Sequence, residues 1–424
     1  MYIFNRTVNV NIITAALLTM LIVPSIAIKS LAQEETPPQT VSAVAWSPNG
    51  ERIAIGDVSG SLVISNFDNS PPITLTEQAA ITTRVDWSPD GALLASGGYG
   101  DSVSIWDTTN GNLVRTFSIS EENIVATLVL WSLDAQSIFT SSATNTAPSL
   151  REWDVRDGTI RHELSGFEAY AATWSPDGQM LAVSGLVQIT FIDSATFTQQ
   201  NRLEPEQGDF DNRYQISSLD WATDGQTMAV GYLNGQVRIW DLARHRILHT
   251  FQANESVSRT SNYRTSSIIA LRYMADETRL VSVSEDGTLR GWDITTGEVI
   301  INQDLAIPVV YSADFSPWGG QIVVGGTPIA PTDSQVAMTE SNTTGLPTNT
   351  LEIVVADPSA ETLQAITDAC GLASAADQAL TAEISAQDYV GFTTQLEALP
   401  ENALPPGCRA DLLAVAAALD AQGE

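Results

Sequence analysis

The pentapeptide WSPDG at residues 87–91 decides the fold of this 424-residue chain, because the chain repeats it. A near-identical copy, WSPNG, occupies residues 46–50, and WSPDG itself returns at residues 174–178. Looser copies begin at four further aromatic residues, which are Trp131, Trp221, Tyr273 and Phe315. Neighbouring copies lie 41 to 52 residues apart. A period of this length predicts a stacked or closed array of one supersecondary unit, and it favours a binding scaffold over an enzyme.

A second signal follows each aromatic residue by about twenty positions, where a short β-rich run ends in an apolar residue and an aspartate. The runs end at Asp68, Asp107, Asp154, Asp193, Asp241, Asp293 and Asp357, and four of them contain Trp-Asp. Nine of the ten tryptophans occupy one of the two repeat positions: Trp46, Trp87, Trp106, Trp131, Trp153, Trp174, Trp221, Trp240 and Trp292. We interpret these side chains as packing between neighbouring units, since an aromatic ring buries a large area.

Each unit is predicted to form four short strands. In the second unit these are TRVDW, LLASGG, VSIWD and LVRTFS, separated by turns rich in Gly, Pro, Asn and Asp. Proline sets φ in the first turn, and glycine supplies a residue that accepts positive φ. Short β-branched runs at regular spacing predict an all-β protein.

These phrases resemble those of the WD-repeat β-propeller family, in particular of prokaryotic, exported members with SPDG-type repeats. The resemblance covers about residues 40–369 and implies a seven-bladed β-propeller of four-stranded antiparallel blades. The Gly-His pair that family members often carry is absent, and His162, His245 and His249 lie near fourth strands instead. The last outer strand is expected at Thr362 to Ile366, so that C-terminal sequence alone builds blade seven. The expected blades occupy residues 41–76, 81–119, 125–165, 169–203, 215–252, 266–304 and 308–367.

Residues 1–32 predict a secretory signal peptide, followed by a linker at residues 33–40. Arg6 precedes an apolar stretch from Val8 to Ile28, and small residues follow before Gln33. An uncleaved membrane anchor is the alternative, because about twenty apolar residues can span a bilayer. We therefore expect an exported protein that is secreted, periplasmic or on the cell surface.

The chain is strongly acidic, with a formal net charge of −31. Recognition of nucleic acid needs a basic patch, so a nucleic-acid partner is not expected. Electrostatic docking on anionic lipid is not expected either, which leaves no membrane contact beyond the export signal.

The C-terminal segment, residues 370–424, changes in composition and predicts a helical tail. Alanine becomes common, and apolar residues at Tyr389, Phe392 and Leu396 follow helical spacing. Cys370 and Cys408 are the only cysteines and are expected to form a disulfide, with two free thiols as the alternative. The tail is either a cap packed on the propeller or an appendage that binds a partner.

Three long connections, at residues 204–215, 253–266 and 327–349, should crowd one face of the propeller. Loops on a rigid scaffold are where binding residues concentrate, and Arg and Tyr are enriched at interface hot spots. The candidate binding residues are Arg213, Tyr214, Arg259, Tyr263 and Arg264, which would suit an acidic or carboxylate-bearing partner. The alternative is that these arginines neutralise nearby acids and that the tyrosines shield the base of the loops.

No catalytic motif accompanies the repeat. The sequence has no G-x-S-x-G elbow, no H-E-x-x-H and no glycine-rich phosphate loop. We therefore expect a non-enzymatic, extracytoplasmic interaction scaffold that binds a protein or peptide on the loop-rich face, without cofactor or metal. The alternatives are an extracytoplasmic hydrolase-like or lactonase-like enzyme, or a small-ligand binder, that uses the central channel, and a purely structural envelope protein.

Overall fold

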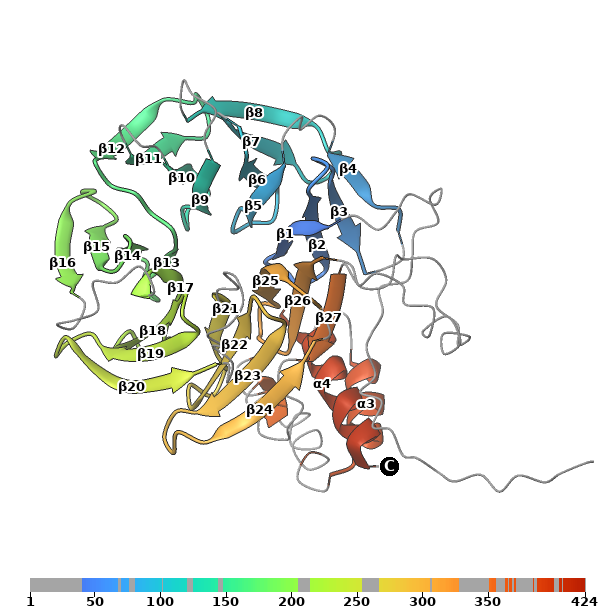
Figure 1. Cartoon of the computed structure of the whole chain (residues 1–424). Helices are drawn as coiled ribbons and strands as arrows, with labels where there is room; N and C mark the ends of the chain where they lie inside the picture. The colour runs from blue at the N-terminus through green and yellow to red at the C-terminus, as the bar shows by residue number, and fades with distance from the viewer. Residues whose placement is uncertain are drawn as a thin grey trace, which may run out of the picture.

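Antiparallel sheets surround a central axis in the order in which the repeats occur (Figure 1). This computed structural model describes residues 40–67, 70–75, 81–100, 102–119, 125–143, 148–204, 214–253, 267–305, 307–327 and 351–355, and residues 363–364, 366–367, 370, 384, 387–399, 404–405 and 407–423 of the C-terminal tail.

Six of the sheets have four strands each, and we number them blades 1 to 6. Blade 1 contains β1 (Val41–Trp46), β2 (Arg52–Asp57), β3 (Leu62–Asn66) and β4 (Ile73–Leu75). Blade 2 contains β5 (Thr82–Trp87), β6 (Leu93–Gly98), β7 (Ser102–Asp107) and β8 (Leu113–Ser118). Blade 3 contains β9 (Val125–Trp131), β10 (Ser137–Ala143), β11 (Ser149–Asp154) and β12 (Ile160–Ser165).

The second half of the ring repeats this arrangement. Blade 4 contains β13 (Ala172–Trp174), β14 (Met180–Ser184), β15 (Ile189–Asp193) and β16 (Gln199–Leu203). Blade 5 contains β17 (Ile216–Trp221), β18 (Thr227–Tyr232), β19 (Gln236–Asp241) and β20 (Arg246–Gln252). Blade 6 contains β21 (Ile268–Tyr273), β22 (Arg279–Ser284), β23 (Thr288–Asp293) and β24 (Val299–Asp304). The last sheet contains β25 (Val310–Phe315), β26 (Gln321–Gly326) and β27 (Leu351–Val355).

The prediction of seven four-stranded blades is wrong, because there are six such blades and the last sheet has three strands in the described part of the chain. The predicted outer strand at Thr362 to Ile366 is also wrong, since Leu363, Gln364 and Ile366 are helical. Leu363, Ile366 and Cys370 recur at helical spacing and are buried in the core of the tail. This helical spacing is visible in the sequence, but the prediction of a seventh four-stranded unit took precedence over it.

The ring closes where the three-stranded sheet packs against blade 1. The amide of Val44 donates to Ser312 Oγ (3.0 Å), and Val41, Val44 and Trp46 share a core cluster with Val323. Gly325 is required at this junction, because a Cβ there would lie 2.4 Å from Val41 Cγ1. Closure therefore depends on side-chain packing between the sheet and blade 1.

The SPDG turns follow the first strand of each repeat and are held by their own side chains. In blade 2, Ser88 Oγ donates to Asp90 Oδ1 (2.6 Å), and the same oxygen accepts from the Ala92 amide (3.0 Å). Gly91 adopts a positive φ of 68°, which glycine takes at little cost. The Ser-to-Asp bond recurs in blades 3 and 4 at 2.6 Å.

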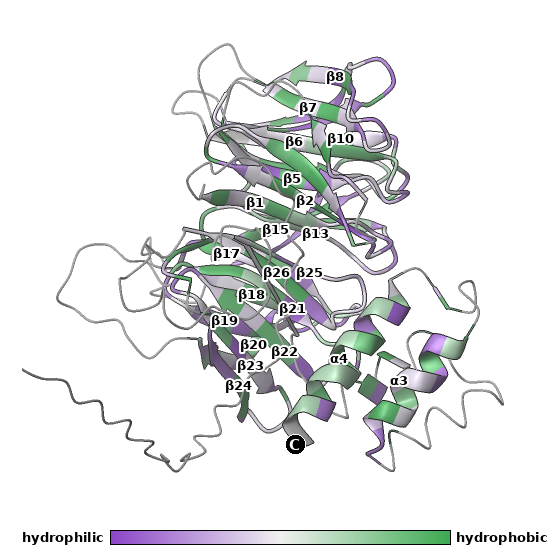
Figure 2. Cartoon of the chain, turned by 90° about the vertical axis from the view of Figure 1, so that its right-hand side faces the viewer, coloured by the Kyte–Doolittle hydropathy of each residue, from purple (hydrophilic) through white to green (hydrophobic). Residues whose placement is uncertain are grey.

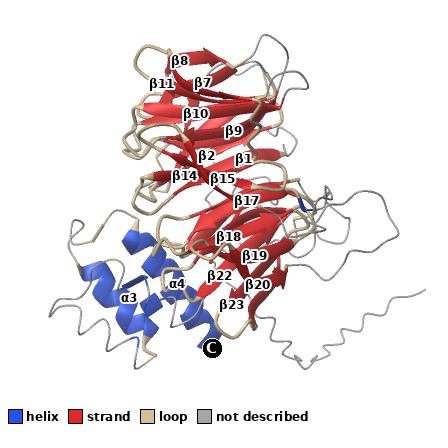
Figure 3. Cartoon of the chain, turned by 90° about the vertical axis from the view of Figure 1, so that its left-hand side faces the viewer, coloured by secondary structure: helices blue, strands red, loops and turns tan. Residues whose placement is uncertain are grey.

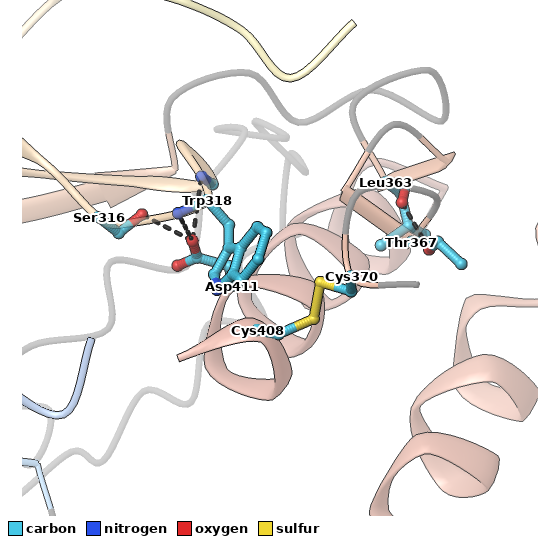
Figure 4. Close-up of a disulfide and its surroundings, with 8 residues drawn as sticks. Ser316, Trp318, Leu363, Thr367, Cys370, Cys408 and Asp411 are labelled. Carbon is cyan, nitrogen blue, oxygen red and sulfur yellow. Dashed lines mark hydrogen bonds between the residues drawn. A yellow bond between two sulfur atoms is a disulfide. The ribbon is translucent and has the colours of Figure 1, made fainter. Parts of the chain in front are cut away.

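The last repeat reads FSPWG and has Trp318 where five of the other turns have aspartate and the first has Asn49. Asp411 of helix α4 (Cys408–Gly423) occupies that place, and its Oδ2 accepts from Ser316 Oγ (2.8 Å), the Trp318 amide (3.2 Å) and the Gly320 amide (3.4 Å) (Figure 4). Ser316 and Gly320 correspond in the repeat to the two groups that bind the aspartate in blade 2. The tail thus supplies the acceptor that the turn itself lacks.

The tail packs as a small helical unit of its own. Helix α3 (Tyr389–Ala398) and α4 share a buried cluster, and a disulfide joins Cys370 to Cys408, as predicted (Figure 4). Gly407 sits so close to the turn of blade 1 that a Cβ would lie 2.6 Å from Asn49 O. The tail therefore bridges the turns of two neighbouring sheets. No helix in the described residues is long and apolar enough to span a bilayer.

Replacing Asp411 by alanine should lower the free energy of unfolding by about 1–3 kcal/mol, because it leaves buried donors without their acceptor. Asp411→Asn keeps an acceptor oxygen and should lose less. Chemical denaturation of the wild type and both variants measures the difference. Asp420→Ala, an exposed acid of the same helix, is the matched control and should stay within about 0.5 kcal/mol of wild type. Equal losses for Asp411→Ala and Asp420→Ala would contradict the conclusion that Asp411 stabilises the turn at Ser316 in place of a turn aspartate.

Candidate binding site in the central channel

The first strands of the sheets enclose a cavity of about 440 Å³ on the axis of the ring. A volume of this size suits a small ligand or one or two side chains of a partner. Its walls come from blades 1, 2, 4, 5 and 6 and from the three-stranded sheet. The site is therefore built by residues far apart in the sequence.

The cavity reaches the face of the ring that carries the turns between second and third strands, which we call the loop face. These turns lie beside the residues that enter the first strands, as the bonds from the Val58 amide to Thr40 O (3.0 Å) and from the Tyr99 amide to Ile81 O (3.0 Å) show. Gln215 and Leu233, which lie at this end of blade 5, line the cavity. Helices α3 and α4 lie on the opposite face, beside the SPDG turns, and leave the loop face uncovered (Figures 2 and 3).

Among the described residues that line this cavity, Arg84 of β5 is the one arginine. Its Nε donates to Thr127 O (3.1 Å) and its Nη1 to Thr83 O (2.8 Å), which orients the guanidinium. Nη2 has no hydrogen-bond partner among the described residues. Partial desolvation inside the ring lowers the pKa of Arg84, although its side chain stays exposed to the channel and an arginine keeps its proton in proteins.

Two aspartates line the same cavity but are already occupied by backbone amides. Asp86 Oδ2 accepts from the Trp131 amide (2.7 Å), and Asp314 Oδ2 accepts from the Trp46 amide (2.7 Å). Asp220 makes the same contact with the Tyr273 amide (2.7 Å). In each case the hydrogen bond joins the carboxylate of one sheet to a backbone amide of the next sheet in the ring, and for Asp314 that next sheet is blade 1.

Burial makes these acids easier to protonate. It raises the pKa of Asp86 to about 7, and the hydrogen bond from the Trp131 amide offsets this rise only in part. It raises the pKa values of Asp220 and Asp314 to about 6 each, against the nearby positive charge of Arg272. Near neutral pH, Arg84 therefore keeps a full charge, whereas the two acids that line the cavity are partly neutral.

The structure places one of the predicted binding residues. Tyr214 is half-buried against blade 5, with its ring 6.4 Å from that of Tyr232, and the Arg238 guanidinium lies 5.1 Å from both ring centroids. The other four, Arg213, Arg259, Tyr263 and Arg264, lie outside the described residues.

Sequence reasoning missed Arg84, although a comparison of the repeats at one position could have found it. Three residues before the repeated aromatic, the other units have Ala43, Leu128, Ala171, Ser218, Ala270 and Ser312. Only the second unit has a charge at this position. The described residues contain no cluster of three His, Cys, Asp or Glu side chains that could hold a metal ion.

Between about pH 8 and pH 5, the free energy of unfolding should rise as the pH falls. The folded pKa values of Asp86, Asp220 and Asp314 lie above the unfolded value of 3.8, so the folded state binds more protons in this window and is destabilised as the pH rises. Asp90 stays ionised throughout, because the hydroxyl of Ser88 lowers its pKa. Urea unfolding at pH 5.5 and pH 8 should differ by at least about 1 kcal/mol.

Asp86→Asn provides the control for this pH dependence. The amide keeps an acceptor for Trp131 but cannot titrate, so the slope of stability against pH should become shallower. A free energy of unfolding of the wild type that stays constant or falls as the pH is lowered from 8 to 5.5 would contradict the raised pKa values of these aspartates.

Comparison with known proteins supports the repeat family. Three family models match: "Anaphase-promoting complex subunit 4 WD40 domain" at residues 201–264, "Eukaryotic translation initiation factor eIF2A" at residues 16–152 and "WD domain, G-beta repeat" at residues 254–293. Among curated relatives, the human angio-associated migratory cell protein is 24% identical over 276 residues, which is 62% of this chain and 59% of that protein. The match thus spans less than two thirds of that relative's length.

Two further relatives are named as subunits of larger assemblies. Eukaryotic translation initiation factor 3 subunit I of Culex quinquefasciatus is 25% identical over 268 residues, which is 60% of this chain and 76% of that protein. Anaphase-promoting complex subunit cdc20 of Dictyostelium discoideum is 21% identical over 216 residues, which is 50% of this chain and 40% of that protein. None of these three relatives has the name of an enzyme.

These names also correct the predicted localisation. Translation initiation and the anaphase-promoting complex are intracellular eukaryotic systems, so the comparison contradicts the prediction of an exported protein. The signal peptide assigned to residues 1–32 lies outside the described residues. Together with the repeated sheets around a central axis, the family models and relatives support placing this chain in the WD40 repeat family.

Proposed function

We propose that this chain is a non-enzymatic interaction scaffold that binds a protein or peptide on its loop face. WD40 propellers typically act as protein-interaction scaffolds, and two of the relatives are named as subunits of larger complexes. The proposal depends chiefly on one observation, which is the set of exposed apolar side chains on the loop face, where the channel opens.

These side chains come from equivalent turns of three blades. Val58 of blade 1 is 39% exposed, Tyr99 of blade 2 is 56% exposed and Leu186 of blade 4 is 49% exposed. Tyr311, which lines the channel, is 45% exposed. Exposed apolar groups around a concave centre are typical of binding surfaces, in which a few aromatic and apolar anchors supply most of the affinity.

The rest of the ring offers a comparison surface. The outer strands also expose apolar residues, including Leu113 (51%) beside Val114 (49%) and Val299 (51%) beside Ile300 (44%), which lie on the outer edges of blades 2 and 6. Exposed apolar residues are normal on soluble proteins, and these lie away from the cavity. The loop face differs because its exposed apolar residues lie on the face at which the cavity opens, and because helices α3 and α4 lie on the opposite face.

Replacing Val58, Tyr99 and Leu186 by serine should abolish binding of partners that the wild-type chain retains in affinity capture, because the apolar anchors are lost. A matched variant with Leu113, Ile160 and Val299 replaced by serine should retain them. Both variants keep the buried cores, so their thermal unfolding should match that of the wild type. Loss of partners from the rim variant but not from the loop-face variant would overturn the proposal.

A further inference from the structure

We propose that the central channel is a carboxylate-binding site in which Arg84 holds the ligand. The proposal rests on the proposed function, because it specifies which chemical group of a partner enters the mouth of the channel. It starts from the charges inside the cavity, which are those of Arg84, Asp86 and Asp314.

Both acids already accept backbone amides that join neighbouring sheets. The two oxygens of Asp314 accept from Trp46 (2.7 Å) and from Phe315 (2.9 Å). Asp86 accepts the Trp131 amide (2.7 Å) through Oδ2. A cationic ligand would have to compete with these amides for acceptors that join neighbouring sheets. The cavity is therefore poorly suited to a lysine or arginine of a partner.

Arg84 has the opposite properties. Two bonds to carbonyl oxygens fix its plane, and its Nη2 has no partner among the described residues. A planar guanidinium held in one orientation is suited to binding a carboxylate through charge-assisted hydrogen bonds. Nothing in the described lining neutralises Arg84 by a direct ion pair.

Further donors lie in the same walls. Thr83 and Ser217 line the cavity, and their hydroxyl oxygens are buried without a hydrogen-bond partner in the described part of the chain. Ser312 accepts the Val44 amide, which leaves the proton of its own hydroxyl available. A hydroxyl can donate as well as accept a hydrogen bond, so these side chains can complement Arg84 as donors to a carboxylate in the cavity.

The overall charge of −31 affects how the carboxylate arrives. A free anion in solution is repelled by this chain at low ionic strength. A carboxylate carried by a partner that docks on the loop face is held near the mouth by other contacts. Both sources offer the same chemical group, and the test distinguishes them.

The test uses calorimetric titration of the full chain with two probes, succinate and an amidated, acetylated Gly-Gly-Glu-Gly-Gly peptide. We expect Arg84→Gln to weaken binding of the better probe by about tenfold or more, because a charge-assisted bond is lost. Arg202→Gln, an exposed arginine on β16, is the matched control and should bind as the wild type does. Tighter binding of succinate would indicate a free acid, and tighter binding of the peptide would indicate a side chain of a partner.

Two further variants keep the test decisive if Arg84→Gln unfolds. Arg84→Lys keeps the positive charge but loses the planar guanidinium, so it should bind the better probe weakly. Ser217→Ala removes one hydroxyl donor and should reduce the affinity for that probe by a few-fold. Failure of both probes to bind the wild type, or equal binding by a folded Arg84→Gln variant, would overturn the carboxylate site. Loss of captured partners from the loop-face variant would still support the scaffold in that case, so the two proposals can fail separately.

Discussion

Side-chain contacts at the repeated aromatic residue and at the residue before it hold the sheets of this ring together. Sheets in a propeller have no hydrogen-bonded ladder between them, so their order depends on side chains that cross the junctions. The indoles of Trp87, Trp131 and Trp174 donate to main-chain carbonyls of the preceding blade at 2.9 to 3.1 Å. Where blade 5 meets blade 6 and where the last sheet meets blade 1, the aromatic amides of Tyr273 and Trp46 bind a buried aspartate.

The remaining two junctions follow the same logic with other groups. Arg272 of blade 6 donates to the carbonyls of Ser316 and Pro317 in the last repeat, at 3.1 and 2.9 Å. Between blades 4 and 5, the ring of Trp221 packs edge-on against Phe191 with their centroids 5.4 Å apart. The repeated aromatic residue or the residue before it thus makes a contact at every junction, although its chemistry changes from junction to junction.

This use of charged side chains determines what the channel can bind. The aspartates near the axis serve the structure, because their oxygens join neighbouring sheets and burial favours their neutral form. Arg84 is anchored only to carbonyls and keeps donor capacity toward the cavity. An acidic protein can therefore have a channel that favours an anionic group. The tail contributes by staying on the opposite face, where Asp411 completes a turn that lacks its own aspartate.

The sequence by itself determined the parts of the structure that depend on local pattern. The spacing of the aromatic residues predicted the repeated four-stranded unit, and the two cysteines predicted the disulfide. The end of the ring was predicted wrongly, because the repeat pattern was extended over Leu363 and Ile366, whose three-residue spacing fits a helix and whose side chains pack in the core of the tail. The Asp411 contact joins groups 95 residues apart, and the site around Arg84 draws its walls from six sheets. Only the tertiary structure decided these features, because they depend on which distant residues the closed ring brings within hydrogen-bond distance.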